Sequence, residues 1–284
     1  MVLPGIVLVL IYCYGPMFGL VMAFQDYDPT LGFFRSPWVN LDNFKYILSL
    51  PDTVQVLNNT IFIAGMKIIF ETFASILIAI LLNEVNHKFF KKTIQTIIYF
   101  PYFLSWIVLG GILRNVLSID GILNKFLAIF GVNSIMFLGN VKAFPYLLVI
   151  TDAWQQVGFG TIIYLAAITN INPALYEASA IDGANRWKQT IHITLQGMKP
   201  IIVLMATLSL GNILNAGFDQ IYVLYSPLVY QSGDVIDTWV FRMGLINAQY
   251  SVAAAVGLFR SLVSFILIGL SYFFAHKYAD YRIF

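Results

Sequence analysis

The stretch NINPALYEASAIDGANRWKQTIHITLQGMKP, residues 170–200, separates two long apolar runs and decides how the chain is organised. The run before it covers residues 144–168 and the run after it covers residues 200–222. Each run is long enough to cross a bilayer as a helix. Asn172 followed by Pro173 predicts a helix start, because asparagine caps helices and proline suits the first helical position. We therefore expect a short surface helix between two membrane spans.

The composition of the whole chain points to the same class. Of 284 residues, 59% are hydrophobic and only 11% are charged, whereas roughly 25% are charged in a typical soluble domain. Four further apolar runs bring the expected number of spans to six, and they cover residues 3–24, 58–82, 94–114 and 252–275. We expect an all-α polytopic membrane protein that forms one membrane domain over residues 1–284.

The positions of lysine and arginine predict the orientation in the membrane. One set of connections holds Lys88, Lys91, Lys92, Arg186, Lys188, Lys199, Lys277 and Arg282. The opposite connections are longer and hold only Arg35, Lys45, Arg114, Lys125, Lys142 and Arg242. Because positive charge favours the inner side, we expect the 169–199 loop and both termini in the cytoplasm. The net charge of +2 includes no basic stripe, so no nucleic-acid partner is expected.

Residues of the 170–200 stretch form a spaced motif. Glu177-Ala178-Ser179 is followed after three residues by a glycine and, nine residues later, by Ile193-Thr194-Leu195. The motif resembles the EAA loop of membrane subunits of binding-protein-dependent ABC importers. It departs from the family at Ser179, where alanine is usual, and at Gln196, where proline is common. The resemblance implies that the ATPase is contacted by Glu177, Ala178, Ser179, Gly183, Ile193 and Leu195.

Further stretches resemble the saccharide-importing branch of that family, in particular permeases of the LplB and YteP type for oligosaccharides or polysaccharide fragments. They are NEV (83–85), YFPYFLSW (99–106), YEASAIDGANRWKQTIHITL (176–195) and LVYQSGDVIDTWVFRMGL (228–245). The resemblance implies a type I permease fold with six transmembrane helices and a cytoplasmic coupling helix. It also implies a subunit of the bacterial plasma membrane that moves its substrate by alternating access.

The resemblance implies several partners: a second, different permease chain, two ABC ATPase subunits and an external solute-binding protein, with a saccharide as substrate and lipid around the spans. The sequence agrees that ATP is hydrolysed by other subunits, since no G-x-x-x-x-G-K-[ST] phosphate loop occurs in it. We therefore expect no cofactor in this chain, with ATP and magnesium bound by the partners. The three histidines are scattered, so we expect no metal site, and we expect no catalytic residues.

Polar residues inside spans are costly and therefore mark a candidate substrate pathway. The candidates are Asp152, Gln156, Phe159, Asn212, Asn215, Asp219 and Arg260. Spacing puts Asn212, Asn215 and Asp219 on one face of a helix. The same spacing puts Asp152, Gln156 and Phe159 on one face of the preceding span. Carboxylates and amides suit sugar hydroxyl groups, and aromatic rings suit sugar faces. Hydrogen bonds between helices explain any single one of these residues equally well.

Counting residues from the outer ends of the expected spans places Lys67, Asp152, Asn215 and Arg260 in one layer of the bilayer, about 12 to 14 Å below those ends. Lys67 and Glu71 are spaced for an ion pair within one helix, which would remove both from the pathway. Lys67 and Arg260 could instead neutralise the carboxylate of an acidic sugar, or merely pair with Asp152 and Glu71.

Two other classes compete with the importer. An ion-coupled secondary transporter would show an internal repeat with paired broken helices, and we find no convincing repeat. An intramembrane enzyme would need a catalytic constellation at matched depths, and none is evident. We expect a saccharide-importing permease subunit, with ion-coupled transport as the alternative.

Overall fold

The computed structural model describes residues 2–279 of the chain, with side chains described to Phe273. Over these residues every regular element is a helix, apart from one isolated bridge between Gln25 and Trp38. Four single segments are long and apolar enough to cross a membrane: Leu3–Phe24, α4 (Asp52–Glu84), Arg186–Gly211 and Tyr250–Phe273, which belongs to α15 (Tyr250–Ala279). Six segments qualify if each of two bent helix pairs counts as one span. The predicted all-α membrane fold is confirmed.

The remaining elements form the two bent pairs, subdivide two of the single segments, or connect the spans. Leu3–Phe24 comprises α1 (Leu3–Val9), η1 (Leu10–Tyr14) and η2 (Gly15–Phe24), and Arg186–Gly211 comprises α10 (Arg186–Gln189), η5 (Thr190–Thr194) and α11 (Leu195–Gly211). The bent pairs use α5 (Lys88–Tyr99), η3 (Phe100–Phe103), α6 (Trp106–Val116), α8 (Phe144–Thr169) and α9 (Pro173–Ile181). Connecting elements are α2 (Gly32–Arg35), α3 (Asp42–Ser49), α7 (Ile122–Ile129), η4 (Phe137–Gly139), α12 (Phe218–Leu224), η6 (Pro227–Val229), α13 (Tyr230–Gly233), α14 (Ile236–Phe241) and η7 (Arg242–Ile246).

The third predicted span, residues 94–114, is not one straight helix. The chain bends by 103° between η3 and α6. Pro101 cannot donate a helical hydrogen bond, and Ser105 then caps a new helix by accepting a hydrogen bond from the Val108 N–H at 3.4 Å. The length of the apolar run was predicted correctly, but the break within it was missed.

The fifth predicted span, residues 200–222, is also broken. Its helix begins at Arg186 and ends at Gly211, and Pro200 lies within it without ending it. Residues 212–217, here called the 212–217 break, lead to α12. Gly217 has a φ of 90°, a left-handed conformation that glycine adopts without steric cost. Gly217 immediately precedes α12, so residues 218–224 form a separate helix rather than the end of the fifth span.

Helices α4 and α8 pack along each other at the centre of the bundle. Gly160 permits this close approach, because a Cβ atom there would lie 2.4 Å from Ser75 Oγ. Ser75 Oγ also donates a hydrogen bond to the Val157 carbonyl at 3.3 Å. Small and hydroxylated residues at such contacts are typical of helix packing inside membranes. The pair forms the scaffold for the remaining elements.

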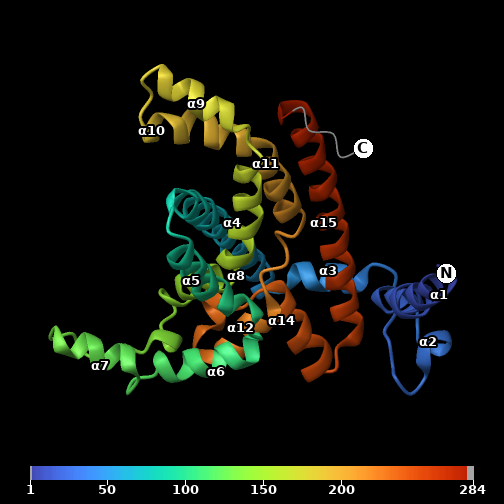
Figure 1. Cartoon of the computed structure of the whole chain (residues 1–284). Helices are drawn as coiled ribbons and strands as arrows, with labels where there is room; N and C mark the ends of the chain where they lie inside the picture. The colour runs from blue at the N-terminus through green and yellow to red at the C-terminus, as the bar shows by residue number, and fades with distance from the viewer. Residues whose placement is uncertain (1, 280–284) are drawn as a thin grey trace.

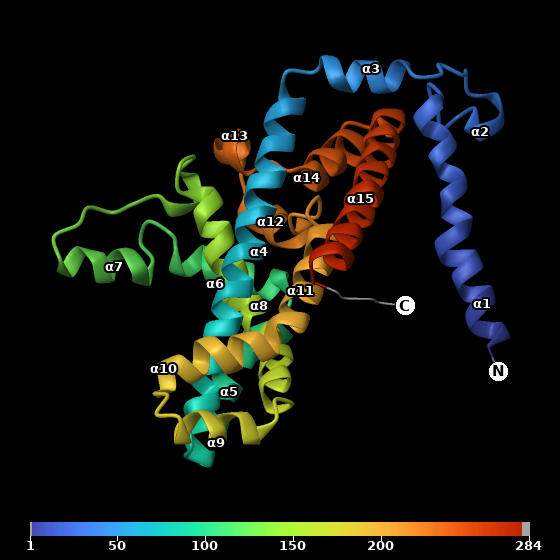
Figure 2. The same cartoon turned by 90° about the horizontal axis from the view of Figure 1, so that it is seen from above.

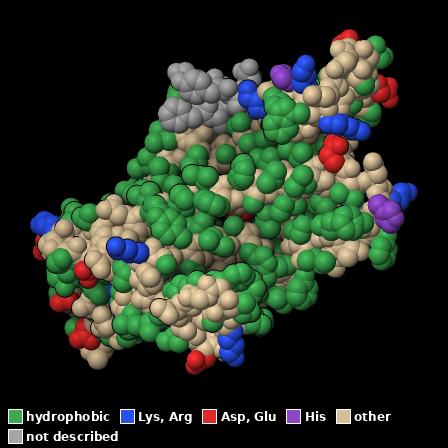
Figure 3. Space-filling view, turned by 90° about the vertical axis from the view of Figure 1, so that its left-hand side faces the viewer, with side chains coloured by type: hydrophobic (Ala, Val, Ile, Leu, Met, Phe, Trp, Pro, Cys, Tyr) green, Lys and Arg blue, Asp and Glu red, His purple; other side chains and the backbone are tan. Residues whose placement is uncertain are grey.

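The remaining elements surround this pair unevenly (Figures 1 and 2). Helices α9 and α10 project at one end of the molecule, while α6, α12 and α14 lie at the other end. Helices α1 and α7 stand away from the bundle in both views. Hydrophobic side chains cover the broad face seen in Figure 3, and charged side chains gather toward the two ends. This distribution is that of a protein surrounded by lipid at its middle.

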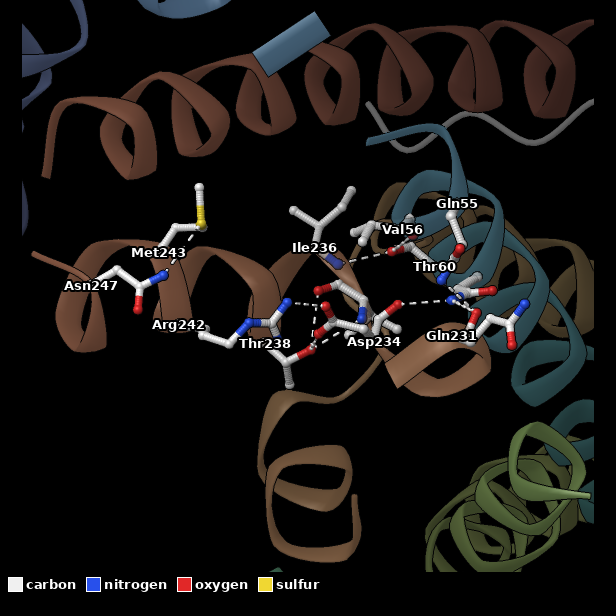
Figure 4. A network of polar contacts seen from close by, with 12 residues as sticks. Gln55, Val56, Thr60, Gln231, Asp234, Ile236, Thr238, Arg242, Met243 and Asn247 are labelled. Carbon is white, nitrogen blue, oxygen red and sulfur yellow. Dashed lines mark hydrogen bonds and ion pairs between the residues drawn. The ribbon is translucent and has the colours of Figure 1, made fainter. Parts of the chain in front are cut away.

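A polar network fastens the end of the bundle opposite α9 (Figure 4). The Asn59 amide of α4 donates hydrogen bonds to the carbonyls of Gln231 and Asp234, both at 3.1 Å. The buried Asp234 carboxylate accepts from Thr238 Oγ1 at 2.7 Å and from Arg242 Nη2 at 2.5 Å. The Asp234 carboxylate therefore holds the segment between α13 and η7 together, and Asn59 fastens that segment to α4.

Candidate functional site

The 170–200 stretch folds into a helical hairpin, here called the 172–194 hairpin. Asn172 caps α9 by accepting a hydrogen bond from the Ala174 N–H at 3.0 Å, with Pro173 at the first helical position, so the predicted helix start is confirmed. Gly183 has a φ of 75° and reverses the chain between α9 and α10. The left-handed conformation explains why a glycine stands at this position.

Side-chain hydrogen bonds hold the two legs of the hairpin together. The buried Gln189 amide donates to the Tyr176 carbonyl at 3.2 Å and to Ser179 Oγ at 3.0 Å. The hydroxyl groups of Tyr176 and Thr194 are hydrogen-bonded at 2.9 Å. The motif gave no signal for Gln189, because its partners lie 10 and 13 residues away on another helix.

The outer surface of the hairpin is exposed and partly apolar. Glu177, Ala178 and Gly183 are exposed, while Ser179, Ile193 and Leu195 are partly buried. Ile181 and Trp187 are 87% and 70% exposed, the exposure expected of side chains that contact another protein or lipid. A cavity of about 550 Å³ between the legs is lined by Tyr176, Glu177, Ala180, Ala184, Asn185, Arg186 and Gln189. The role of the motif residues in ATPase contact stays a prediction.

A second cavity, here called the polar cavity, lies between α4, α8 and the end of α11 and is open on one side, where Asn212 and Asn215 are exposed. Its volume is about 250 Å³. Its walls are formed by Ala64, Lys67, Ile68, Glu71, Asp152, Leu208, Ser209, Asn212, Asn215, Ala216 and Gly217. The structure therefore brings three of the predicted pathway residues together: Asp152 from α8, and Asn212 and Asn215 from the 212–217 break. Two carboxylates, two amides and a hydroxyl group face one space in an otherwise apolar bundle.

Lys67 is the best-connected side chain of the polar cavity. It is only 6% exposed, and its Nζ donates hydrogen bonds to Asp152 Oδ1 at 3.1 Å and to the Ala216 carbonyl at 2.7 Å. A third hydrogen bond goes to Gln220 Oε1. The expected pairing of Lys67 with Glu71 is wrong, because the ammonium turns toward α8 and the 212–217 break. Contrary to that expectation, both Lys67 and Glu71 line the cavity.

The other predicted pathway residues lie elsewhere. Gln156 donates a hydrogen bond to Gln155 Oε1 at 2.9 Å, and the Phe159 ring stacks on Tyr102 with centroids 4.9 Å apart. Asp219 is exposed on α12. The predicted face of Asn212, Asn215 and Asp219 does not exist, because the helix ends before Asn212.

Arg260 does not line the polar cavity with Lys67 and Asp152. It forms an ion pair with Asp237 of α14. Burial raises the pKa of the Asp237 carboxyl group, and the Arg260 guanidinium opposes that shift. The error arose because counting residues along spans gives depth but not the direction in which a side chain points.

The sequence analysis did not identify Gln220, which connects Lys67 to α8. Its side chain is fully buried, and its amide donates to the Leu148 carbonyl and to Thr151 Oγ1, both at 2.8 Å. The cost of burying an amide in a membrane could have identified it as a candidate.

A bundle of apolar helices, an exposed hairpin between two spans and an open polar cavity between helices are features of a membrane transport subunit. The chain belongs to the family of binding-protein-dependent transport system inner membrane components, whose sequence profile matches residues 72–283. It is therefore a transport component and not an enzyme.

Two relatives from Bacillus subtilis (strain 168) match nearly the whole chain. Protein LplB is 38% identical over 279 residues, which are 98% of this chain and 88% of that protein. The polygalacturonan/rhamnogalacturonan transport system permease protein YteP is 39% identical over 281 residues, which are 99% of this chain and 88% of that protein. A solved bacterial alginate ABC transporter, in complex with an alginate pentasaccharide-bound periplasmic protein, is similar at 34% identity. Its TM-score is 0.92, with 100% of this chain and 95% of that chain covered.

Proposed function

We propose that the chain is the permease subunit of an ABC importer that carries an oligosaccharide or polysaccharide fragment across the bacterial plasma membrane by alternating access. The observation that carries this proposal is the polar cavity between the apolar helices. Hydroxyl groups of a sugar need amide and carboxylate partners in fixed positions. Asn212, Asn215, Asp152 and Glu71 offer such partners around one space.

The substrate class that we propose is an oligosaccharide of uronic acids. YteP is named for polygalacturonan and rhamnogalacturonan, and the similar solved transporter carries alginate, which is an acidic polysaccharide. Lys67 and Arg260 do not offer free charge to a uronate, because Lys67 pairs with Asp152 and Arg260 pairs with Asp237. We therefore propose that this chain recognises the sugar through hydroxyl groups rather than through its carboxylates.

The exposed hairpin suggests a contact with an ATPase, and the width that a saccharide path needs suggests a second permease chain. We propose that the ATPase contacts Glu177, Ala178, Ser179, Gly183, Ile193 and Leu195, and that two ATPase subunits bind ATP and magnesium. One bundle does not enclose a path for a bulky solute, so a second permease chain completes it, and an external binding protein delivers the sugar. In this arrangement the 169–199 loop and both termini face the cytoplasm, within one membrane domain over 1–284. The terminal residues 1 and 280–284 lie outside the described part.

The experiment is a measurement of ATP hydrolysis in nanodiscs. The chain is purified together with the ATPase and permease chains encoded beside it, and uronate oligosaccharides are added with the binding protein. We expect one oligosaccharide to stimulate hydrolysis, and we expect Glu177→Lys and Gly183→Asp to abolish the stimulation. Asp120→Lys places the same charge change on an exposed residue far from the hairpin and serves as the control. If no ATPase copurifies, or if neither hairpin substitution has an effect, the proposal fails.

A further inference from the structure

One continuous helical segment joins the 172–194 hairpin to the polar cavity. Arg186–Gly211 is a single span of 26 residues, and it comprises α10, η5 and α11. At about 1.5 Å per residue it is about 39 Å long. Its first turn belongs to the hairpin, where Gln189 bonds to the other leg. Its last turn contributes Leu208 and Ser209 to the cavity wall. A displacement of the hairpin along this segment therefore reaches the cavity.

The 212–217 break at the end of that segment is held by the packing of Leu214 and Ala216 in the core and by a hydrogen bond from α4. Lys67 Nζ donates to the Ala216 carbonyl at 2.7 Å, next to Gly217. The fit is close, because a Cβ atom on Gly217 would lie 3.0 Å from Lys67 Nζ. The break also provides Asn212 and Asn215 to the cavity. The position of these amides therefore depends on how the break is held.

Lys67 connects the break to both helices of the central pair. It belongs to α4, its ammonium pairs with Asp152 of α8, and it also donates to Gln220 of α12. An ammonium group has three donors, and each of them has a partner here. Gln220 is in turn anchored on α8 through the Leu148 carbonyl. No other basic side chain lines the polar cavity within the described residues.

We propose that Lys67 is a positioning residue that fastens the 212–217 break to α4 and α8, so that movement of the hairpin is transmitted to the amide groups of the polar cavity. The proposal rests on the proposed function, since it assigns the contact through which the ATPase and the sugar influence each other. Lys67 acts here through Ala216 and Gln220 and not by contact with the sugar. The proposal predicts that removing the ammonium uncouples the cavity from the hairpin.

The test uses the complex in nanodiscs with the binding protein and a uronate oligosaccharide. Lys67→Met keeps a long side chain but removes the charge and its three hydrogen bonds. We expect the ratio of stimulated to unstimulated hydrolysis to fall roughly tenfold, or to one if the initial ratio is smaller, which is the factor associated with losing a hydrogen bond to a charged group. Lys125→Met removes an exposed lysine of α7 and should leave the ratio unchanged.

A second variant keeps Lys67 and Asp152 in place. Gly217→Ala introduces a methyl group against the ammonium and a side chain at a φ of 90°, so we expect the same loss of stimulation. Gly65→Ala is the matched control on α4, because a Cβ atom there meets nothing within 4 Å. If the complex that carries Lys67→Met does not assemble, the stimulation measured with Gly217→Ala tests the role of the Lys67 contact instead.

A thiol reporter separates transmission from a general loss of structure. In a Cys13→Ser background, Ser209→Cys places one thiol on the cavity wall. We expect its labelling rate to change when ATP and vanadate are added, and we expect Lys67→Met to remove that change. The complex with the natural Lys67 is tested first, because absent sugar stimulation there would refute the proposed function itself. Stimulation and nucleotide-dependent labelling that persist in both Lys67→Met and Gly217→Ala would overturn the role of Lys67 alone.

Discussion

Substituting Asp234 by alanine is expected to destabilise the chain by about 3 kcal/mol. The change removes the acceptor of Thr238 Oγ1 at 2.7 Å and of Arg242 Nη2 at 2.5 Å. Among the residues that the structure describes, Arg242 Nη1 has no hydrogen-bond partner, so the guanidinium would lose its ion pair as well. Breaking a buried ion pair costs about 3–5 kcal/mol. We expect the lower limit, because the Arg242 side chain is 21% exposed and keeps its contact with the Tyr230 ring, 4.4 Å from the centroid.

Thermal unfolding in detergent micelles measures this effect. About 3 kcal/mol corresponds to a decrease in Tm of roughly 6–12 °C for a chain of this size class. Asp234→Asn keeps an oxygen acceptor and should lower Tm by about half as much. In a double-mutant cycle, Arg242→Met should recover part of the loss, because it removes the unpaired charge. A decrease below about 2 °C for Asp234→Ala, or strictly additive effects in the cycle, would refute the assignment of Asp234 as the residue that holds the segment between α13 and η7 together.

Three further substitutions probe the hairpin, the contact of α8 with α5 and the cavity. Gln189→Ala removes the hydrogen bond to Ser179 Oγ, so amide hydrogen exchange in α9 should become faster, and unchanged exchange would contradict the hairpin geometry. Gly158→Ala places a methyl group 2.6 Å from a backbone carbonyl of α5 and should cost about 1–3 kcal/mol in thermal unfolding, whereas Gly111→Ala, which meets nothing within 4 Å, should be neutral. Asn215→Leu should weaken sugar stimulation of ATP hydrolysis more than tenfold, and unchanged stimulation would remove this amide from the pathway.

The long-range organisation could be predicted because it depends on properties of whole segments. The length of an apolar run decides whether a helix crosses a bilayer, and the pair Asn172 and Pro173 fixes a helix start locally. The breaks in the third and fifth spans could not be predicted in the same way. The break in the third span depends on Pro101 and Ser105, and the start of α12 after the second break depends on Gly217; an averaged hydropathy does not register such single positions.

The candidate site was predicted only in part for a related reason. The cost of burying polar groups in a membrane identified Asp152, Asn212 and Asn215 as candidates, and all three line the polar cavity. Spacing along a helix suggested the wrong partner for Lys67, because its actual partner lies 85 residues away on α8. Helix packing selects such pairs, and a single sequence contains no direct record of that packing.

We propose that ATP hydrolysis by partner subunits, and not an ion gradient, moves a saccharide through this chain. The most direct measurement is uptake of a labelled uronate oligosaccharide by proteoliposomes that contain the complete complex and the binding protein. We predict accumulation only when ATP is present on the side where the ATPase lies, and no dependence on a proton or sodium gradient. Accumulation without ATP that is driven by an imposed gradient would contradict the account and would indicate ion-coupled transport.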